Sequence, residues 1–293
     1  MPRTIVATDR HRSEQIAPGV FLEEFYPGGK DGPNAVVLSD YPGGQVWSET
    51  VMLGDESSSF IAAIPDIRLP ANQIWPLHWH DCWVGILIVE GTCLIGDWWM
   101  KPGDVLITQE SLEYGPLLIG PTGCRMFEIF AKLHLQSGGY AKEYHDHPTL
   151  QGGSMAFNFT ERKGVNTRND GNQCLPLVGI EGFTKGSLVP GSLWDLGSGG
   201  DPERSVLKVE RLAPGERIAP HSRKDWYAVV VFEGSLEVAG RTLGRDQFLR
   251  IAPDSAVPEI TAGADGALVL ELARTAVATD RVPAQQNVAE GIA

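Results

Sequence analysis

One stretch of this sequence occurs twice, and the repeat limits the folds that the chain can adopt. Residues 67–91 align without a gap on residues 210–234, at an offset of 143 positions. The copies share six identities and one order of features: a turn, a histidine, an aromatic residue, a four-residue apolar run and a Glu-Gly pair. A period this long indicates two duplicated domains, because the units of a solenoid are only about 20–50 residues long.

The length of the chain accommodates two such domains. Its 293 residues suit two domains of about 130 residues each. After the Glu-Gly pair both copies continue with similar strands and turns, and we expect the second copy to be about three residues shorter there. The expected layout is an N-terminal domain over 1–140, a connection over 141–183, a C-terminal domain over 184–278 and a tail over 279–293.

Short apolar runs bounded by Gly, Pro, Asp and Asn dominate the chain. Typical examples are residues 85–91, 104–109, 228–234 and 267–273. Each has the length of a strand and is rich in Val, Ile and Leu. The 34 glycines and 20 prolines are spread along the chain, which suits many turns. The pattern predicts an all-β protein built from sandwiches or closed barrels.

Composition argues against several classes of function. A net charge of -13 disfavours a nucleic-acid or anionic-membrane surface, because phosphate binding needs an excess of Lys and Arg. The chain has no apolar run long enough to span a membrane and no apolar signal core at its start, so we expect a cytoplasmic protein. The four cysteines, Cys82, Cys93, Cys124 and Cys174, form no C-x-x-C pair, so no zinc knuckle is indicated.

His78 and His80 form the strongest chemical motif in the sequence. Residues i and i+2 of a strand point to the same face, so an H-x-H pair can place two imidazoles on one metal ion. Imidazole suits Fe, Zn, Mn and Ni, but two ligands are too few for a tight site. The alternative is that both histidines are hydrogen-bonded pocket residues without a metal.

These motifs resemble those of the cupin superfamily, the RmlC-like double-stranded β-helix proteins. The matching residues are His78-Trp79-His80, Gly91 and Pro102-Gly103-Asp104. The resemblance covers most of residues 55–131 and 185–275, and the arrangement is similar to bicupins of the ChrR-type and acetylacetone-dioxygenase-like groups. It implies two tandem cupin jelly-roll barrels, a mononuclear metal site and a dioxygenase reaction, with isomerase or lyase chemistry behind it.

The sequence departs from the cupin pattern at two metal ligands. The Glu ligand falls at Val84 in the first copy and at Tyr227 in the second, and the later His falls at Tyr114. In the second copy the paired histidines become His221 and Arg223. This pair could bind an anionic group, but we interpret it as the remnant of a site in a structural domain, and we expect the functional site in the first barrel.

Tyr114 and Glu128 are the candidates for catalytic residues. Tyr114 occupies the place of the missing His and is expected to be a third ligand or an acid–base residue. Glu113 is its neighbour, and only one of the two can face inward because adjacent strand residues face opposite ways. Glu128 alternates with apolar residues on a predicted strand, where a buried carboxyl needs a partner.

Aromatic side chains surround the histidine pair. The residues expected to line a small-molecule pocket are Trp75, Trp83, Trp98 and Met126. Plain core packing is the alternative and is favoured for Trp83, because Trp226 repeats it in the second copy. Trp98 and Trp99 are adjacent, so only one can face in. A second H-x-H, His145 and His147, lies in the connection and is interpreted as a solvated loop that could also form a lid.

Three hypotheses for function follow. In the first, a divalent metal ion (Fe, Zn, Mn or Ni) held by His78 and His80 acts as a Lewis acid or activates oxygen on a small oxygenated organic molecule. In the second, the chain is a non-catalytic small-molecule-binding or structural bicupin, as the missing ligands favour. In the third, His80 and Tyr114 perform metal-free acid–base catalysis. We expect a homodimer with a small-molecule ligand and without nucleic-acid or membrane partners.

Overall fold

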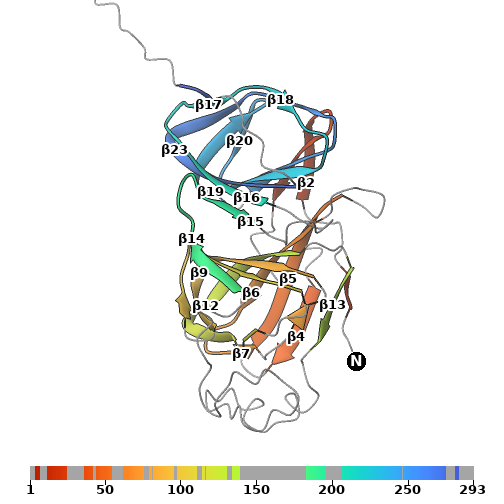
Figure 1. Ribbon diagram of the computed structural model, residues 1–293, viewed down its shortest axis with the longest axis vertical. Coiled ribbons are helices and arrows are strands. Elements are labelled where there is room, and N and C mark those ends of the chain that lie inside the picture. Colours follow the sequence, from red (N-terminus) through yellow and green to blue (C-terminus); the bar gives the residue numbers. More distant parts are fainter. Residues whose placement is uncertain are drawn as a thin grey trace, which may run out of the picture. The chain divides into compact units, whose positions relative to one another are not determined.

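Figure 1 shows the computed structural model of the protein. The structure describes residues 4–6, 12–24, 36–41, 44–54, 62–75, 79–80, 82–95, 98–110, 114–115, 117–130, 134–138, 183–195, 206–245, 247–274 and 281–283. Strands and turns account for these residues, and no helix occurs among them. It follows that this part of the chain offers no helix long and apolar enough to cross a membrane. The prediction of an all-β fold is confirmed.

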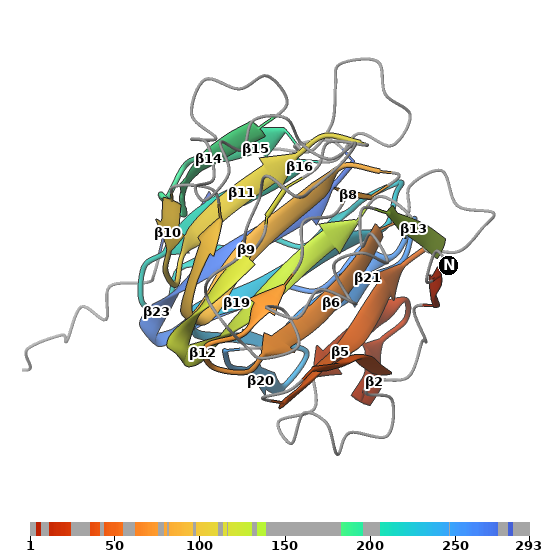
Figure 2. The ribbon, with the colours of Figure 1, turned by 90° about the horizontal axis from the view of Figure 1, so that it is seen from below.

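The first unit is built on a nine-stranded antiparallel sheet with the order β14-β11-β9-β12-β6-β5-β4 along its main path. Its strands are β4 (Val36–Tyr41), β5 (Gly44–Leu53), β6 (Ala62–Leu69), β7 (Ile74–Trp75), β9 (Val84–Ile95), β10 (Trp98–Met100), β11 (Asp104–Thr108), β12 (Leu117–Phe130) and β14 (Phe183–Ser187). A small sheet of β1 (Thr4–Val6), β13 (His134–Gly138) and β8 (Trp79–His80) completes it. Figure 2 shows the curved sheet and β14 beside β11.

The second unit repeats this plan in a ten-stranded sheet with the order β15-β16-β23-β19-β21-β3-β2. Its strands are β2 (Arg12–Ala17), β3 (Val20–Glu24), β15 (Leu193–Asp195), β16 (Val206–Leu212), β17 (Arg217–Ile218), β19 (Tyr227–Val238), β20 (Arg241–Leu243), β21 (Gln247–Ile251), β23 (Ile260–Ala273) and β24 (Arg281–Val282). The pair β18 (His221–Ser222) and β22 (Ala256–Val257) forms a separate two-stranded sheet.

The two barrels keep one register throughout. Strands β7, β9, β10, β11 and β12 become β17, β19, β20, β21 and β23 at the same offset of 143 residues that the sequence repeat has. The expectation that the second copy is shorter is therefore wrong. The turn before β21 lacks the Pro102-Gly103 pair that marks the turn before β11, and this difference hides the alignment.

The repeated Glu-Gly pair lies within strands β9 and β19, where their pairing with β12 and β23 is irregular, and backbone geometry explains its glycine. Gly91 and Gly234 have φ angles of +70° and +73°, a region that L side chains rarely adopt. A Cβ at either position would lie 2.0 Å from a carbonyl oxygen, that of Gly123 in the first unit and of Gly266 in the second. Both copies therefore need glycine for its backbone angle and for the close approach of two strands.

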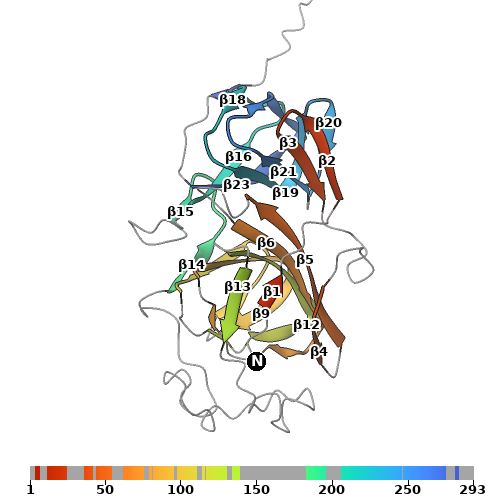
Figure 3. The ribbon, with the colours of Figure 1, turned by 90° about the vertical axis from the view of Figure 1, so that its right-hand side faces the viewer.

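The outer strand of each sheet receives a partner from outside its own repeat. The hairpin β2–β3 pairs with β21 in the second unit, as Figure 3 shows, while β14 pairs with the equivalent strand β11 in the first. Both units are consequently discontinuous in sequence, whereas the expected domains were continuous. The added strands cover sheet edges that would otherwise expose unpaired backbone groups.

Candidate functional site

The first barrel brings together three of the predicted site residues, His80, Tyr114 and Glu128. His80 ends β8, Tyr114 forms an isolated bridge, and Glu128 lies near the end of β12. The alternation of side chains along β12 places Glu128 on the same face as Met126 and Phe130. All three site residues are buried, with exposed fractions of 4%, 0% and 6%.

The three side chains form a hydrogen-bonded chain. The Tyr114 hydroxyl shares a hydrogen bond of 3.0 Å with Nε2 of His80, and the tautomer of the imidazole decides which of the two donates. The edge of the His80 ring packs on Phe130, with ring centroids 4.9 Å apart. Tyr114 also hydrogen-bonds to Glu128. Tyr114 therefore links an imidazole to a carboxyl group away from water.

Glu128 is a buried acid without a basic partner among the described residues. Burial raises the pKa of its carboxyl to about 8, and the hydrogen bond from Tyr114 lowers it in part. None of the Lys or Arg side chains in the described part of the chain forms an ion pair with it. In the absence of an external cation, the Glu128 carboxyl is accordingly protonated at neutral pH.

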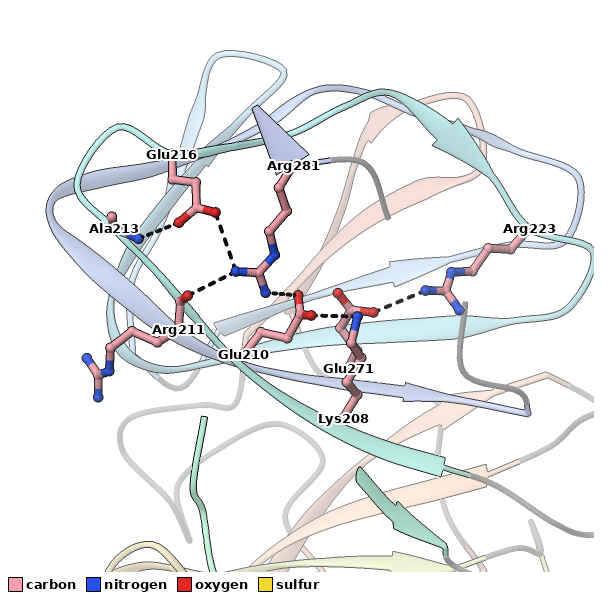
Figure 4. Close-up of polar contacts among 8 residues, drawn as sticks. All are labelled: Lys208, Glu210, Arg211, Ala213, Glu216, Arg223, Glu271 and Arg281. Atoms are coloured by element: carbon pink, nitrogen blue, oxygen red, sulfur yellow. Dashed lines mark hydrogen bonds and ion pairs between the residues drawn. The ribbon is translucent and has the colours of Figure 1, made fainter. Parts of the chain in front are cut away.

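Glu271 is the counterpart of Glu128 in the second barrel. Glu128 lies opposite Ile86 and Glu271 opposite Val229, at the repeat offset. Here Arg223 donates from Nη2 to Oε2 of Glu271 at 3.1 Å, within the charged network of Figure 4. Burial raises the pKa of Glu271, while Lys208 and Arg223 act in the opposite direction.

The buried glutamate at this position of the repeat therefore has different charged neighbours in the two barrels. The position of Arg223 is occupied by His80 in the first copy, and the position of Lys208 is occupied by Pro65. The second barrel supplies fixed positive charge to its glutamate, whereas the first offers an imidazole and a phenol. A group that brings positive charge fits the first barrel, because an uncompensated buried carboxylate is costly.

Each barrel also pairs one histidine with one tyrosine. In the second barrel, His221 Nε2 lies 3.0 Å from the Tyr227 hydroxyl, and Nδ1 lies 3.0 Å from the carbonyl oxygen of Ala219. Nδ1 therefore donates to the carbonyl, and Nε2 of the neutral ring accepts from the hydroxyl. Tyr227 and Tyr114 occupy different places in the repeat, those of the missing Glu and the missing His of the cupin pattern.

Several predicted site residues lie outside the described residues. These are His78, Glu113, His145 and His147. Trp75 lies on β7, but its side chain is also outside the described part. Among the described tryptophans, Trp83 is buried, Trp98 is half-buried and Trp99 is 51% exposed, so Trp99 is the one of the adjacent pair that faces out.

The side chains gathered in the first barrel are of chemical types that bind metal ions. No group of three or more His, Cys, Asp or Glu side chains gathers within the described ranges. His80 and Glu128 nevertheless offer an imidazole nitrogen and a carboxylate oxygen, donors used for zinc, iron and manganese, and Tyr114 adds a phenol oxygen. The Glu128 carboxyl, which has no Lys or Arg partner in the described ranges, is the feature that a divalent cation would satisfy.

Two features of these sites were not found by sequence reasoning. The equivalence of Glu128 and Glu271 follows from extending the offset of 143 to the last strand, but the supposed length difference concealed it. Cys93 and Cys124 are the second feature, two buried thiols in contact with each other. Burial, the hydrogen bond with Cys124 and the charge of Glu128 raise the pKa of Cys93, which keeps this thiol neutral.

Comparison with known proteins defines the fold. No protein-family model matches the chain, and no curated protein matches it in sequence. A point mutant of oxalate decarboxylase from Bacillus subtilis matches with a TM-score of 0.51 and 13% identity, over 85% of this chain and 77% of its own. An 11S globulin from Wrightia tinctoria with an auxin binding site matches with a TM-score of 0.50 and 14% identity, over 85% of each chain.

The protein is therefore built as two tandem cupin jelly-roll barrels. The same fold occurs in a decarboxylase and in a globulin. Function has to be argued from the site, because one fold hosts many activities.

Proposed function

We propose that the first barrel is a metal-dependent enzyme site for a small oxygenated organic molecule. The observation that carries this proposal is that the buried glutamates of the two copies have different neighbours. Arg223 forms an ion pair with Glu271 at 3.1 Å, while His80 occupies the position of this arginine in the first copy. A divalent cation would bring to the first barrel the positive charge that arginine brings to the second.

The residues that would hold this ion are His80 and Glu128, with Tyr114 as a further oxygen donor. His78 is the fourth candidate, from the H-x-H motif. When bound, such an ion polarises a carbonyl oxygen or generates a nucleophile from water at neutral pH. The resemblance to acetylacetone-dioxygenase-like bicupins favours dioxygenase chemistry, with isomerase or lyase chemistry as the next choice.

The side chains of the barrel have their own parts in this chemistry. Tyr114, whose hydroxyl reaches His80 and Glu128 in the metal-free site, would donate a proton to, or accept one from, an oxygen of the substrate. Met126 and Phe130 form an apolar wall on the face that carries Glu128. Their burial excludes water and strengthens each electrostatic interaction at the site.

Metal-free acid–base catalysis is the second candidate. The observation that favours it is the uninterrupted hydrogen-bonded chain of His80, Tyr114 and Glu128, combined with a carboxyl whose pKa burial raises to about 8. Under this proposal the neutral Glu128 acts as an acid near neutral pH, where general acids are most effective. Isomerisation of a hydroxy-ketone is the type of reaction that such a chain serves.

Elemental analysis of the purified protein distinguishes these candidates. We expect a stoichiometric divalent metal ion in the wild type after expression in metal-supplemented medium. The ion should be lost in His80→Ala and in Glu128→Gln. It should be retained in the control His221→Ala, which removes a histidine from the second barrel.

Other results of this experiment would reject the metal proposal. Metal-free protein whose activity on a hydroxy-ketone is abolished by Tyr114→Phe would favour acid–base catalysis. Metal-free protein that a small ligand stabilises against heat, without turnover, would identify a binding protein.

A further inference from the structure

Contacts of two different kinds hold the ring of His80. Its Nε2 lies 3.0 Å from the Tyr114 hydroxyl, and this hydrogen bond acts within the plane of the ring. The ring of Phe130 lies 4.9 Å away between centroids, with the two planes at 70° to each other. Pairs of aromatic rings prefer such an edge-to-face arrangement at centroid distances of about 4.5–7 Å. Phe130 therefore restricts the rotation of the imidazole while Tyr114 bonds to one of its nitrogens.

The position of Phe130 is itself determined by the sheet. It is the last residue of β12, and its backbone lies opposite Val84 of β9 and Ala63 of β6. Its side chain is only 1% exposed, and a large ring in a close-packed interior has few alternative orientations. Glu128 lies two residues earlier on the same face of β12, so one strand places both the buried carboxyl and the ring that contacts His80.

The second barrel has a small side chain at this place. Ala273 occupies the repeat position of Phe130, just as Arg223 occupies that of His80. Both residues line a hollow of about 310 Å³, and Arg223 reaches Glu271 at 3.1 Å. The fold therefore accepts a methyl group at this position. The phenyl ring occurs in the copy that has the imidazole, and its contact with the imidazole is what the structure shows for it.

We propose that Phe130 is a positioning residue for the candidate metal ligand His80. This inference rests on the function proposed for the first barrel. A ligand that is already held in one orientation loses less conformational entropy when an ion binds. Residues that orient a metal-binding histidine typically change the metal affinity by about 10–100-fold when they are replaced. Phe130 offers no donor atom to the ion and acts through the imidazole alone.

Two variants of the full-length protein separate the ring from its bulk. Phe130→Leu keeps a branched apolar side chain without the ring, and Phe130→Ala removes the bulk as well. The affinity for Mn²⁺ is measured from the electron paramagnetic resonance of the free ion. We expect binding at least about tenfold weaker in both variants. The matched control is Phe127→Leu on the same strand, where the buried ring lies 5.5 Å from the Arg125 guanidinium, and it should bind Mn²⁺ like the wild type.

A second measurement needs no metal ion. The imidazole nitrogen signals of His80 in the NMR spectrum of chelator-treated protein report the tautomer of the ring and its exchange between orientations. We expect one sharp pair of signals in the wild type and in Phe127→Leu. In Phe130→Leu and Phe130→Ala the signals should broaden or move toward a common average. A loss of thermal stability alone would not produce this change.

The two readouts distinguish the failure of this inference from the failure of the proposed function. Wild-type protein that binds no Mn²⁺, together with disturbed His80 signals in both Phe130 variants, would support the positioning of His80 and reject the metal site. Unchanged His80 signals in a folded Phe130→Leu or Phe130→Ala would overturn the inference, and so would wild-type Mn²⁺ affinity in these variants. An equal disturbance in Phe127→Leu would also overturn it, because the effect would then be one of general packing.

Discussion

At the scale of single residues, the central feature is a pair of equivalent glutamates that have different surroundings in the two barrels. Glu128 and Glu271 occupy the same register position. His80 occupies the repeat position of Arg223 in the first barrel. The substitution of an arginine by a histidine converts a permanently charged partner into one that can bind a proton or a metal ion.

The titration of Glu128 should make the stability of the metal-free protein depend on pH. Its folded-state pKa is raised from 4.5 to about 8, so the folded state binds the proton more tightly than the unfolded state. Stability is then fully present below the lower value and declines as the pH rises through the upper one. Urea denaturation of chelator-treated protein from pH 5 to pH 9 should show a loss of a few kcal/mol in the wild type.

The Glu128→Gln variant provides the control for this prediction. It removes the titrating group and should flatten the difference between low and high pH. Parallel profiles for the wild type and Glu128→Gln would show that Glu128 does not titrate in this range.

Sequence reasoning located the residues of the first site better than their partners. His80 and Tyr114 were placed together by the cupin motifs, and Glu128 by its alternation on a strand. The ion pair of Arg223 and Glu271 was not predicted, because the two residues are 48 positions apart and no local pattern joins them. Contacts of this kind depend on strand register, which a single sequence determines weakly.

At the scale of elements, glycine inside a long strand allows close approach to its neighbour where the pairing is irregular. Gly91→Ala should be destabilised by about 3 kcal/mol or more, because the residue has a φ of +70° and its Cβ would overlap the carbonyl oxygen of Gly123. The matched control is Gly103→Ala, which has a φ of +90° but meets no atom within 4 Å. It should cost only about 1 kcal/mol. Equal urea midpoints for the two variants would contradict this account.

Ion pairs link the short strand β24 to the rest of the second barrel. Arg281 contacts Glu210 at 2.6 Å and Glu216 at 3.4 Å, as Figure 4 shows, and it donates to the carbonyl oxygen of Arg211 at 3.2 Å. Glu210 is buried and also pairs with Lys208 at 2.5 Å. Arg281 therefore compensates part of the charge of a buried carboxylate.

Removing this arginine should destabilise the second barrel. Arg281→Ala is expected to lower the free energy of unfolding by about 1–2 kcal/mol, since Arg281 is partly exposed but its partner is buried. Arg241→Ala breaks an exposed pair with Glu14 and should cost less than about 1 kcal/mol. Thermal denaturation that ranks the two variants in the reverse order would refute the role assigned to Arg281.

The strands of the repeat were predictable, but their outer partners were not. Apolar runs such as 85–91 and 228–234 lie within β9 and β19. They could be recognised as strands because a strand buried on both faces has a continuous apolar run in place of polar alternation. The hairpin β2–β3 and the strand β14 lie outside the repeat. Their pairing with β21 and β11 has no signature in the sequence, because any extended segment can add to an open edge.

At the scale of the whole molecule, a duplicated architecture carries two different sets of interior charges. The strands of the two copies keep an equal offset, while cations around the buried glutamate occur, among the residues that the structure describes, only in the second copy. We infer that the first barrel binds an external cation, whereas the second barrel balances its buried glutamate with its own cationic side chains. The fold itself is shared with proteins that are only 13–14% identical, so the interior charges carry the specific information.

Exchanging one residue between the barrels tests this account most directly. His80→Arg places in the first barrel the side chain that neutralises Glu271 in the second. The measurement is the metal content of wild type and variant, purified side by side and checked for folding by thermal denaturation. We predict a stoichiometric metal ion in the wild type and none in a His80→Arg variant that remains folded. A metal-free wild type, or a folded variant that keeps the ion, would contradict the claim that a cation balances Glu128.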